Sequence, residues 1–481
     1  MENLEPAGVW RHFAAICAIP RPSLHEAALR AHIAEWAKGK GIASFVDRAG
    51  NLILKKPASK GAESMPGVIL QGHLDMVCQA NSGTRHDFER DPIETVAKDG
   101  WVVAEDTTLG ADNGIGVALA LAALEEPGLR HPAIEVLLTV NEESGMDGAR
   151  GLEPGTLEGR LLINMDSEEW GHFYLGCAGG VDVEVFEHFG LEEGAAGECF
   201  RLDVGGLQGG HSGIDIHLGR GNAIRLLAEA VNFLSECADL RLVGIYGGTA
   251  RNAIPREAHA VFSVREAAGM ADRVAGKNAE WRRRFAGADP NVSLTLTPCQ
   301  SNGEKCISGS DRLTGFLCTV PDGVSAMSED FPGVVETSSN LGVAGLEDGL
   351  FRATFKVRSL ADENRDRLAD ELIAHARYFG FSAEKKGAYP GWTPDPASPL
   401  LELLQHVYVA KFGAKASLQV IHAGLECGLL SASHPHLDMI SFGPDIRGAH
   451  APGERVEIGS VARCWELLKA ALQALSSPAG R

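Results

Sequence analysis

Three short, continuously apolar runs in the first half of the chain constrain its fold most strongly. They are GVILQ at 67–71, AIEVLLTV at 133–140 and LLINM at 161–165. Strands without polar alternation are typical of a parallel sheet that helices cover on both faces. Residues 113–126, between the first two runs, are apolar nearly all round, which indicates a buried helix. The sequence therefore predicts an α/β domain with a mostly parallel sheet flanked by helices.

The pattern changes after Gly179 and Gly180. Apolar and polar residues now alternate, which is typical of antiparallel strands with one solvated face. Residues 242–264 indicate a hairpin that turns near Gly247 and Gly248. These features predict a second, α+β domain. Its expected strands include 181–186, 200–204 and 258–264, and its expected helices are 222–236, 270–285 and 361–379.

A proline-rich stretch at 389–399 marks the end of this second domain. The first pattern then returns, with helices expected at 400–412 and 458–475 and a strand at 416–421. The economical interpretation is a catalytic domain interrupted by an insertion. We expect the catalytic domain at 1–182 and 389–481, and an inserted lid domain at 183–388.

Charge and composition narrow the class of protein. The net charge of −20 argues against nucleic acid or an anionic membrane as the main partner. No apolar run reaches the roughly 18 residues that a membrane span needs, and the N-terminus has no secretory signal pattern. The ten cysteines contain no CxxC pair, so we expect reduced thiols and a cytoplasmic protein.

Histidine and carboxylate side chains fall where the apolar runs end. His73 and Asp75 follow the first run, Glu142 and Glu143 follow the second, and Asp166 follows the third. In open parallel sheets, sites are built at this edge. Each motif also has a plain structural interpretation: His73 and Asp75 could be a core pair, and the two glutamates an acidic loop.

Two further residues extend this set. Asp112 lies in the glycine-rich TTLGADNGIG at the mouth of the buried helix, and His450 lies in the loop GAHAPGERV. Asp112 could simply cap the helix, and a lone loop histidine is more often solvated. Taken together, two imidazoles and several carboxylates suit zinc, manganese or cobalt. Five ligands with one shared carboxylate would form a two-metal site about 3.5–4 Å across, which suits hydrolysis.

The chain resembles the M20 metallopeptidases, and most closely the bacterial aminoacyl-histidine (Xaa-His, beta-alanyl-histidine or carnosinase-like) dipeptidases. The likeness covers essentially the whole chain, through ordered blocks such as QGHLDMV, LGADNGIG, NEESGMDGA, INMDSEE, GGHSGIDIH, GGTARNAIP, VRS, HAGLECG and GAHAPGER. The resemblance implies two zinc ions, replaceable by Mn²⁺ or Co²⁺. It implies that His73, Asp112 and Asp166 bind one ion, and that Asp112, Glu143 and His450 bind the other.

The resemblance also implies roles beyond the metal ligands. Asp75 would orient His73, Glu142 would be the general base, and the bond after Asp112 would be cis. In the lid domain, His211 would stabilise the oxyanion, while Asn252 and Arg358 would hold the substrate's C-terminal carboxylate. Without the resemblance, each of these three lid residues is plausibly structural. We interpret His217 and His422 as structural, although His422 in HAGLECG could approach the site, since Glu426 in the same block is an unusual residue to bury.

These expectations combine into one function. We expect a cytosolic di-zinc dipeptidase that hydrolyses unblocked dipeptides, Xaa-His dipeptides included, with a homodimer through the lid as a candidate assembly. A related amidohydrolase, such as an N-acyl amino acid deacylase or a tripeptidase, is the nearest alternative. A catalytically inactive peptide-binding protein is a third, but such a protein should have lost a ligand or the base.

Overall fold

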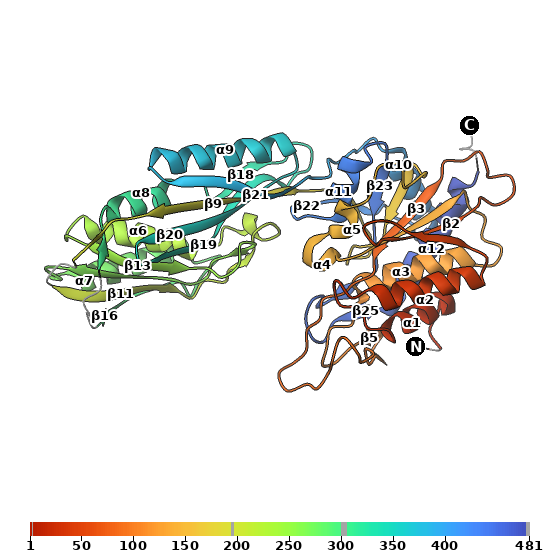
Figure 1. Cartoon of the computed structure of the whole chain (residues 1–481), viewed down its shortest axis with the longest axis horizontal. Coiled ribbons are helices and arrows are strands. Elements are labelled where there is room, and N and C mark those ends of the chain that lie inside the picture. The colour runs from red at the N-terminus through yellow and green to blue at the C-terminus, as the bar shows by residue number, and fades with distance from the viewer. Residues whose placement is uncertain (2, 194–196, 300–304, 478–481) are drawn as a thin grey trace. The chain divides into compact units, whose positions relative to one another are not determined.

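The chain folds into two compact units in the computed structural model, which describes residues 1, 3–193, 197–299 and 305–477 (Figure 1). Unit 1 comprises Met1–Gly176, Trp392–Val420 and Leu425–Arg481, and unit 2 comprises Cys177–Gly391 and Ile421–Gly424. The division differs by several residues from the expected domain boundaries. The return of 421–424 to unit 2 has no counterpart in that expectation.

Unit 1 is built on an eight-stranded sheet in the order β1-β2-β6-β3-β7-β23-β8-β22. The four central strands, β6, β3, β7 and β23, run parallel, whereas β2 and β8 pair antiparallel with their neighbours. The expected parallel sheet therefore forms the centre, and antiparallel strands extend it. The strands are β1 (Ala43–Val46), β2 (Leu52–Lys56), β3 (Val68–His73), β6 (Ile134–Thr139), β7 (Leu161–Asn164), β8 (His172–Cys177), β22 (Ser417–Ile421) and β23 (Asp438–Ser441).

The central strands are apolar because both faces of the sheet are covered. Every residue of β3 and β6 is buried. The buried helix predicted at 113–126 is α3 (Ala111–Glu125), which packs against β3 on one side and α1 on the other. The other helices are α1 (Ala7–Cys17), α2 (Ala27–Gly39), α4 (Glu142–Gly145), α5 (Asp147–Arg150), α10 (Pro399–Phe412), α11 (Glu426–Ser433) and α12 (Ile458–Leu475).

A small antiparallel sheet, β24-β25-β5-β4, completes unit 1. It joins β4 (Val96–Lys98) and β5 (Trp101–Val103) to β24 (Ile446–Arg447) and β25 (Arg455–Glu457). The sheet ties the chain just before α3 to the C-terminal region that carries His450. Among the described residues, no helix combines the length and apolar character needed to cross a membrane.

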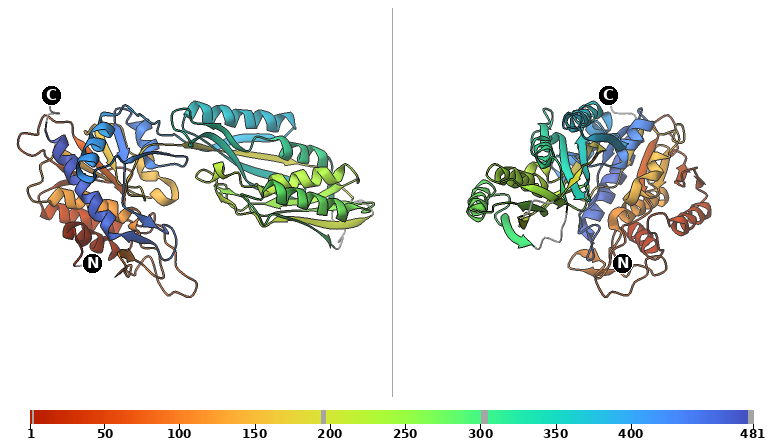
Figure 2. Two further views of the ribbon diagram at one scale, coloured as in Figure 1. Left: turned by 180° about the vertical axis from the view of Figure 1, so that it is seen from behind. Right: turned by 60° about the vertical axis from the view of Figure 1, so that its left-hand side comes forward.

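Unit 2 contains a nine-stranded antiparallel sheet, β16-β11-β15-β13-β19-β20-β9-β21, with β18 paired to β19 (Figure 2). This confirms the predicted α+β class. The strands are β9 (Gly179–His188), β11 (Glu198–Gly205), β13 (Arg241–Gly247), β15 (Ala258–Val264), β16 (Ser293–Cys299), β18 (Gly323–Met327), β19 (Val335–Glu347), β20 (Leu350–Ser359) and β21 (Ser382–Tyr389). The helices are α6 (Ala223–Ser235), α7 (Met270–Arg284), α8 (Ser310–Thr319) and α9 (Asp362–Tyr378), with a 3₁₀ turn at Ile216–Leu218.

Two details of unit 2 differ from expectation. The hairpin of β13 and β15 has a long connection rather than a tight turn, because β14 (Ala253–Ile254) leaves it to pair with β12 (Gly210–His211). Cys199 and Cys299 lie directly opposite each other on β11 and β16 and form a disulfide. The expectation of reduced thiols is therefore wrong for this pair, which lies a hundred residues apart in sequence and next to each other in the sheet.

A substitution at Phe316 tests how the hydrophobic core of unit 2 is packed. Its side chain is fully buried, and its ring centroid lies 4.7 Å from that of Phe381 and 6.3 Å from that of Phe351. We expect Phe316→Ala to lower the free energy of unfolding by about 3–5 kcal/mol, because it leaves a cavity among these rings. Tyr378→Ala, at a side chain that is 85% exposed, is the control. Urea denaturation followed by circular dichroism measures both, and equal midpoints for the two variants would contradict this packing.

Candidate metal centre

The predicted metal ligands gather at the carboxyl edge of the unit 1 sheet. His73 is the last residue of β3, Asp166 follows β7, and Glu142 and Glu143 open α4 directly after β6. Because β6, β3 and β7 are adjacent and parallel, these residues emerge side by side. Asp112 lies at the start of α3, against this edge.

Asp112 stands between two imidazoles. Its Oδ1 lies 3.0 Å from Nε2 of His73, and its Oδ2 lies 3.1 Å from Nε2 of His450. His73 Nε2 is also 3.4 Å from Asp166 Oδ1, and His450 Nε2 is 3.2 Å from Glu143 Oε2. The side chains therefore form two groups of three that share Asp112, and each of its oxygens faces one group.

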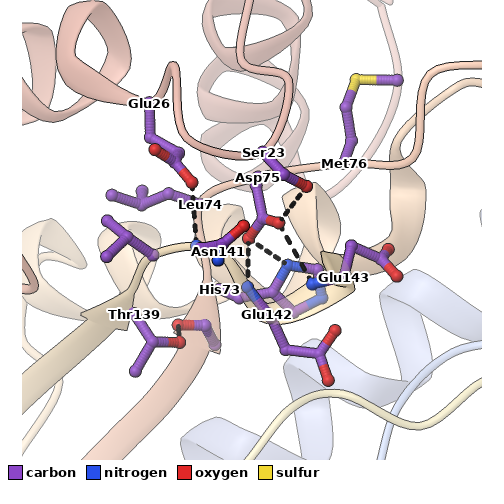
Figure 3. Close-up of polar contacts among 12 residues, drawn as sticks. Ser23, Glu26, His73, Leu74, Asp75, Met76, Thr139, Asn141, Glu142 and Glu143 are labelled. Atoms are coloured by element: carbon purple, nitrogen blue, oxygen red, sulfur yellow. Dashed lines mark hydrogen bonds and ion pairs between the residues drawn. The ribbon is translucent and has the colours of Figure 1, made fainter. Parts of the chain in front are cut away.

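Asp75 connects the first of these groups to the turn that carries the two glutamates (Figure 3). Its carboxylate is fully buried and accepts hydrogen bonds from the backbone N–H groups of Glu142 (3.0 Å) and Glu143 (3.1 Å). Oδ1 of Asp75 is also 3.4 Å from Nδ1 of His73. Burial would raise the pKa of Asp75, but His73, the Ser23 hydroxyl and the N–H of Glu142 outweigh it and lower this pKa to about 2.

The two glutamates of α4 leave the turn in different directions (Figure 3). Glu143 reaches His450, whereas no hydrogen bond or ion pair to a described residue holds the Glu142 carboxylate. Burial, followed by the nearby carboxylates of Asp166, Glu426 and Glu143, raises the pKa of Glu142 well above its ordinary value, against the opposing effect of His73. Glu142 is thus an unengaged carboxyl with a high proton affinity at the edge of the cluster.

A second buried carboxylate, Glu454, shapes the loop that presents Asp112. It accepts hydrogen bonds from four successive backbone N–H groups, those of residues 109–112, at 2.8–3.3 Å. Arg21 closes the loop from the other side by donating to the carbonyl oxygens of Leu74 and Gly110. Gly110 has a φ of +69°, and a Cβ there would clash with Arg21, so only glycine fits. The peptide bond between Asp112 and Asn113 is cis, as the resemblance implied.

The charges of this cluster favour bound cations. Burial raises the pKa of Asp166 to about 8, and the nearby carboxylates of Asp112 and Glu426 add to this effect, against the opposing effect of His73. Hydrogen bonds to Asp112 and Glu143 raise the pKa of His450 to about 11, so the imidazole takes up a proton that partly offsets the negative charge. Two divalent cations would serve the same purpose. The nitrogen and oxygen donors fit zinc, manganese or cobalt, and the donor atoms of His73, Asp112 and Glu143 lie within 4.8 Å of one another.

The predicted substrate residues lie in unit 2. His211, on β12, is half-buried, and its Nδ1 accepts the backbone N–H groups of Gly213 (3.2 Å) and Ile214 (3.0 Å). Burial and then Arg358 lower the pKa of His211 to about 4, so the ring is neutral. A neutral ring whose Nδ1 is an acceptor carries its proton on Nε2. His211 can therefore donate a hydrogen bond from Nε2.

Asn252 and Arg358 occupy different environments. Asn252 is exposed. Its backbone carbonyl oxygen accepts a hydrogen bond from the backbone N–H of Ser212, so Asn252 lies beside His211. Arg358, on β20, is 4% exposed and donates from Nη1 to the Tyr389 hydroxyl at 2.8 Å. His422, interpreted from the sequence as structural, shares a hydrogen bond of 2.8 Å with Ser338, which lies opposite Arg358 in the sheet.

Several residues of the metal centre were missed from the sequence. Glu454 and Arg21 lie inside the blocks GAHAPGER and IPRPS, but nothing in the sequence links them to the Asp112 loop. Glu426 was noted only as an unusual residue to bury. The structure shows that its Oε2 accepts hydrogen bonds from Gln71, two residues before His73, and from Thr139, which is paired with His73, both at 2.7 Å.

Comparisons with known proteins agree with this geometry. Residues 69–474 match the model of peptidase family M20/M25/M40. The chain is 44% identical over 474 residues to the cytosol non-specific dipeptidase of Escherichia coli (strain K12), and the match covers 97% of each protein. The crystal structure of aminoacylhistidine dipeptidase from Vibrio alginolyticus superposes with a TM-score of 0.90 at 41% identity, over 98% of this chain and 97% of that one. The aminopeptidase PepT of Bacillus cereus shares the fold alone, with a TM-score of 0.62 at 16% identity over 98% of this chain and 100% of that one.

The chain belongs to peptidase family M20/M25/M40. The predicted family and fold class are therefore confirmed, and so is a peptide hydrolase as the class of enzyme. The ligand set and the roles of the individual side chains remain predictions.

Zinc binding should release protons from this site. A histidine binds a metal only as the neutral imidazole, and the raised pKa of His450 means that the metal-free protein is protonated there at neutral pH. Acid therefore favours the metal-free form, and zinc affinity should rise by about tenfold per pH unit for each proton displaced. Isothermal titration calorimetry in buffers of different ionisation enthalpy counts these protons. Binding without proton release would contradict the assignment of His450 as a ligand.

Proposed function

We propose that this protein is a metal-dependent dipeptidase that hydrolyses unblocked dipeptides, Xaa-His dipeptides included. The observation that carries the proposal is the shared carboxylate of Asp112, flanked by two three-residue donor groups, with Glu142 unengaged beside them. The names of the two relatives with more than 40% identity, a non-specific dipeptidase and an aminoacylhistidine dipeptidase, support the substrate class.

We assign His73, Asp112 and Asp166 to one zinc ion and Asp112, Glu143 and His450 to the other. When bound, the two ions lower the pKa of a water molecule and polarise the peptide carbonyl. Asp75 fixes His73 with Nε2 directed at the site, because its own oxygen lies beside Nδ1. By accepting the backbone N–H groups of Glu142 and Glu143, Asp75 also holds the turn that carries the base and one ligand.

Glu142 is the general base of the proposed reaction. Its carboxyl lies in a buried, negatively charged environment that favours proton uptake. It therefore accepts the proton of the attacking water and passes it to the departing amine. Glu143 does not serve this purpose, because His450 engages its carboxylate.

Unit 2 would recognise the remainder of the substrate. His211 donates from Nε2 to the oxygen that becomes negative as water adds to the carbonyl. Arg358 and Asn252 bind the C-terminal carboxylate, for which the planar guanidinium of arginine is well suited.

The role of Glu142 is tested by the substitution Glu142→Gln. We expect kcat to fall by at least about a thousandfold, because the amide cannot accept the proton, while the bound zinc, measured by mass spectrometry, stays unchanged. Glu153→Gln, at an exposed glutamate of the same unit, is the control and should keep full activity. Near wild-type turnover in Glu142→Gln would remove this residue from the mechanism.

Substrate class and metal dependence are tested together. Chelation should abolish activity, and added zinc, manganese or cobalt should restore it. On a panel of dipeptides, tripeptides and N-acyl amino acids, we expect hydrolysis of free dipeptides, alanyl-histidine and carnosine among them. Hydrolysis of the N-acyl amino acids alone would overturn the dipeptidase proposal in favour of a deacylase.

A further inference from the structure

Arg358 lies in a row of residues that crosses four strands of unit 2. Ser338 of β19 is opposite Arg358 of β20, Arg358 is opposite Gly180 of β9, and Gly180 is opposite Tyr389 of β21. Gly180 has no side chain, so the guanidinium and the phenol meet across it with 2.8 Å between Nη1 and the hydroxyl oxygen. A Cβ at this glycine would lie 2.5 Å from that hydroxyl oxygen. The contact between arginine and tyrosine therefore depends on glycine at this position.

The Tyr389 ring is held from a second side by the segment at 421–424. A Cβ at Gly424 would lie 2.9 Å from the ring, so the backbone there packs directly on it. The Lys356 ammonium lies 5.0 Å from the ring centroid. These contacts fix the ring, and therefore the direction of its hydroxyl group.

The Arg358 guanidinium is buried without an anionic partner. No carboxylate of the described residues forms an ion pair with it, and its Nε is buried without a hydrogen-bond acceptor in that part of the chain. The nearby acid, Asp182, is instead engaged by Lys356 at 2.9 Å and Arg251 at 2.6 Å. A buried cation without a counter-ion is costly, which favours a negatively charged ligand.

Two further neighbours of Arg358, His422 and Ser338, are neutral. His422 is 5% exposed and hydrogen-bonds to Ser338, and burial followed by the charge of Arg358 lowers the pKa of His422 to about 3. A phenol suits this environment because it accepts a hydrogen bond from the guanidinium without neutralising its charge. A carboxylate in its place would compete with the ligand.

We propose that Tyr389 is a positioning residue that orients the Arg358 guanidinium toward the C-terminal carboxylate of the substrate. The inference rests on the proposed function, in which Arg358 binds that carboxylate. Tyr389 lies in the proline-rich stretch that the sequence interpretation took only as a domain boundary. Tyr389 is the last residue of β21. Through its hydroxyl group, the end of this strand therefore affects how Arg358 binds the free C-terminus of a peptide.

The test is Tyr389→Phe, which keeps the ring and its packing and removes only the hydroxyl. With alanyl-leucine as substrate, we expect KM to rise by about fivefold to tenfold while kcat changes by less than about twofold, since the hydrogen bond acts on a charged group. The matched control is Tyr378→Phe, at the exposed end of α9. Thermal melting verifies that both variants are folded at the assay temperature.

Competitive inhibition by leucine and by leucinamide separates the inference from the function on which it rests. Wild type should bind leucine more tightly than leucinamide, and Tyr389→Phe should lose about fivefold or more of that preference by weakening leucine alone. If wild type binds leucine and leucinamide equally, Arg358 does not bind the C-terminal carboxylate, and this role of Arg358 in the proposed function is wrong. If wild type prefers leucine and Tyr389→Phe keeps the same preference and KM, the proposed role of Tyr389 is wrong.

Discussion

The crowding of carboxylates at the ends of three parallel strands is the constraint on which unit 1 depends. Strands β6, β3 and β7 are apolar along their length and end at the same edge, where Glu142, Glu143, Asp166 and Asp112 converge. Two imidazoles face four carboxylates there, and burial raises the pKa of Asp166 to about 8. The fold supports this concentration of charge because Glu454 and Asp75 anchor their loops through backbone N–H groups rather than through further cations.

Unit 1 gathers negative charge at one edge of its sheet, whereas unit 2 buries a positive charge without a counter-ion in the described part of the chain. There the Arg358 guanidinium is buried, donates to the neutral Tyr389 hydroxyl and forms no ion pair with the described residues. An anionic cluster that favours cations and a buried cation that favours an anion are complementary to different parts of one molecule. Under the proposed function, the peptide carbonyl and the free carboxylate of a dipeptide would satisfy these two requirements.

The helices and strands could be predicted from the sequence, whereas the side-chain hydrogen bonds that hold the loops of the site could not. Residues 258–264 and 458–475 form the expected strand and helix, because their apolar periodicity is strong and their ends are marked. Convergence of His73, Glu143 and Asp166 followed from the rule that adjacent parallel strands end at one edge of the sheet, whereas the place of Asp112 and His450 in the ligand set followed from the resemblance. Side-chain bonds to distant backbone leave no local pattern, so the partners of Glu454 and the hydrogen bond between Arg358 and Tyr389 were not predictable. The disulfide between Cys199 and Cys299 was missed because strand pairing, not spacing, brings the two residues together.

The central claim is that Asp112 holds two divalent cations between two sets of side chains. Anomalous X-ray diffraction at the zinc absorption edge, from crystals grown with zinc, measures this directly. The account predicts two anomalous peaks about 3.5–4 Å apart on either side of the Asp112 carboxylate. One peak beside His73 and Asp166 alone, or no peak within bonding distance of Asp112, would contradict it.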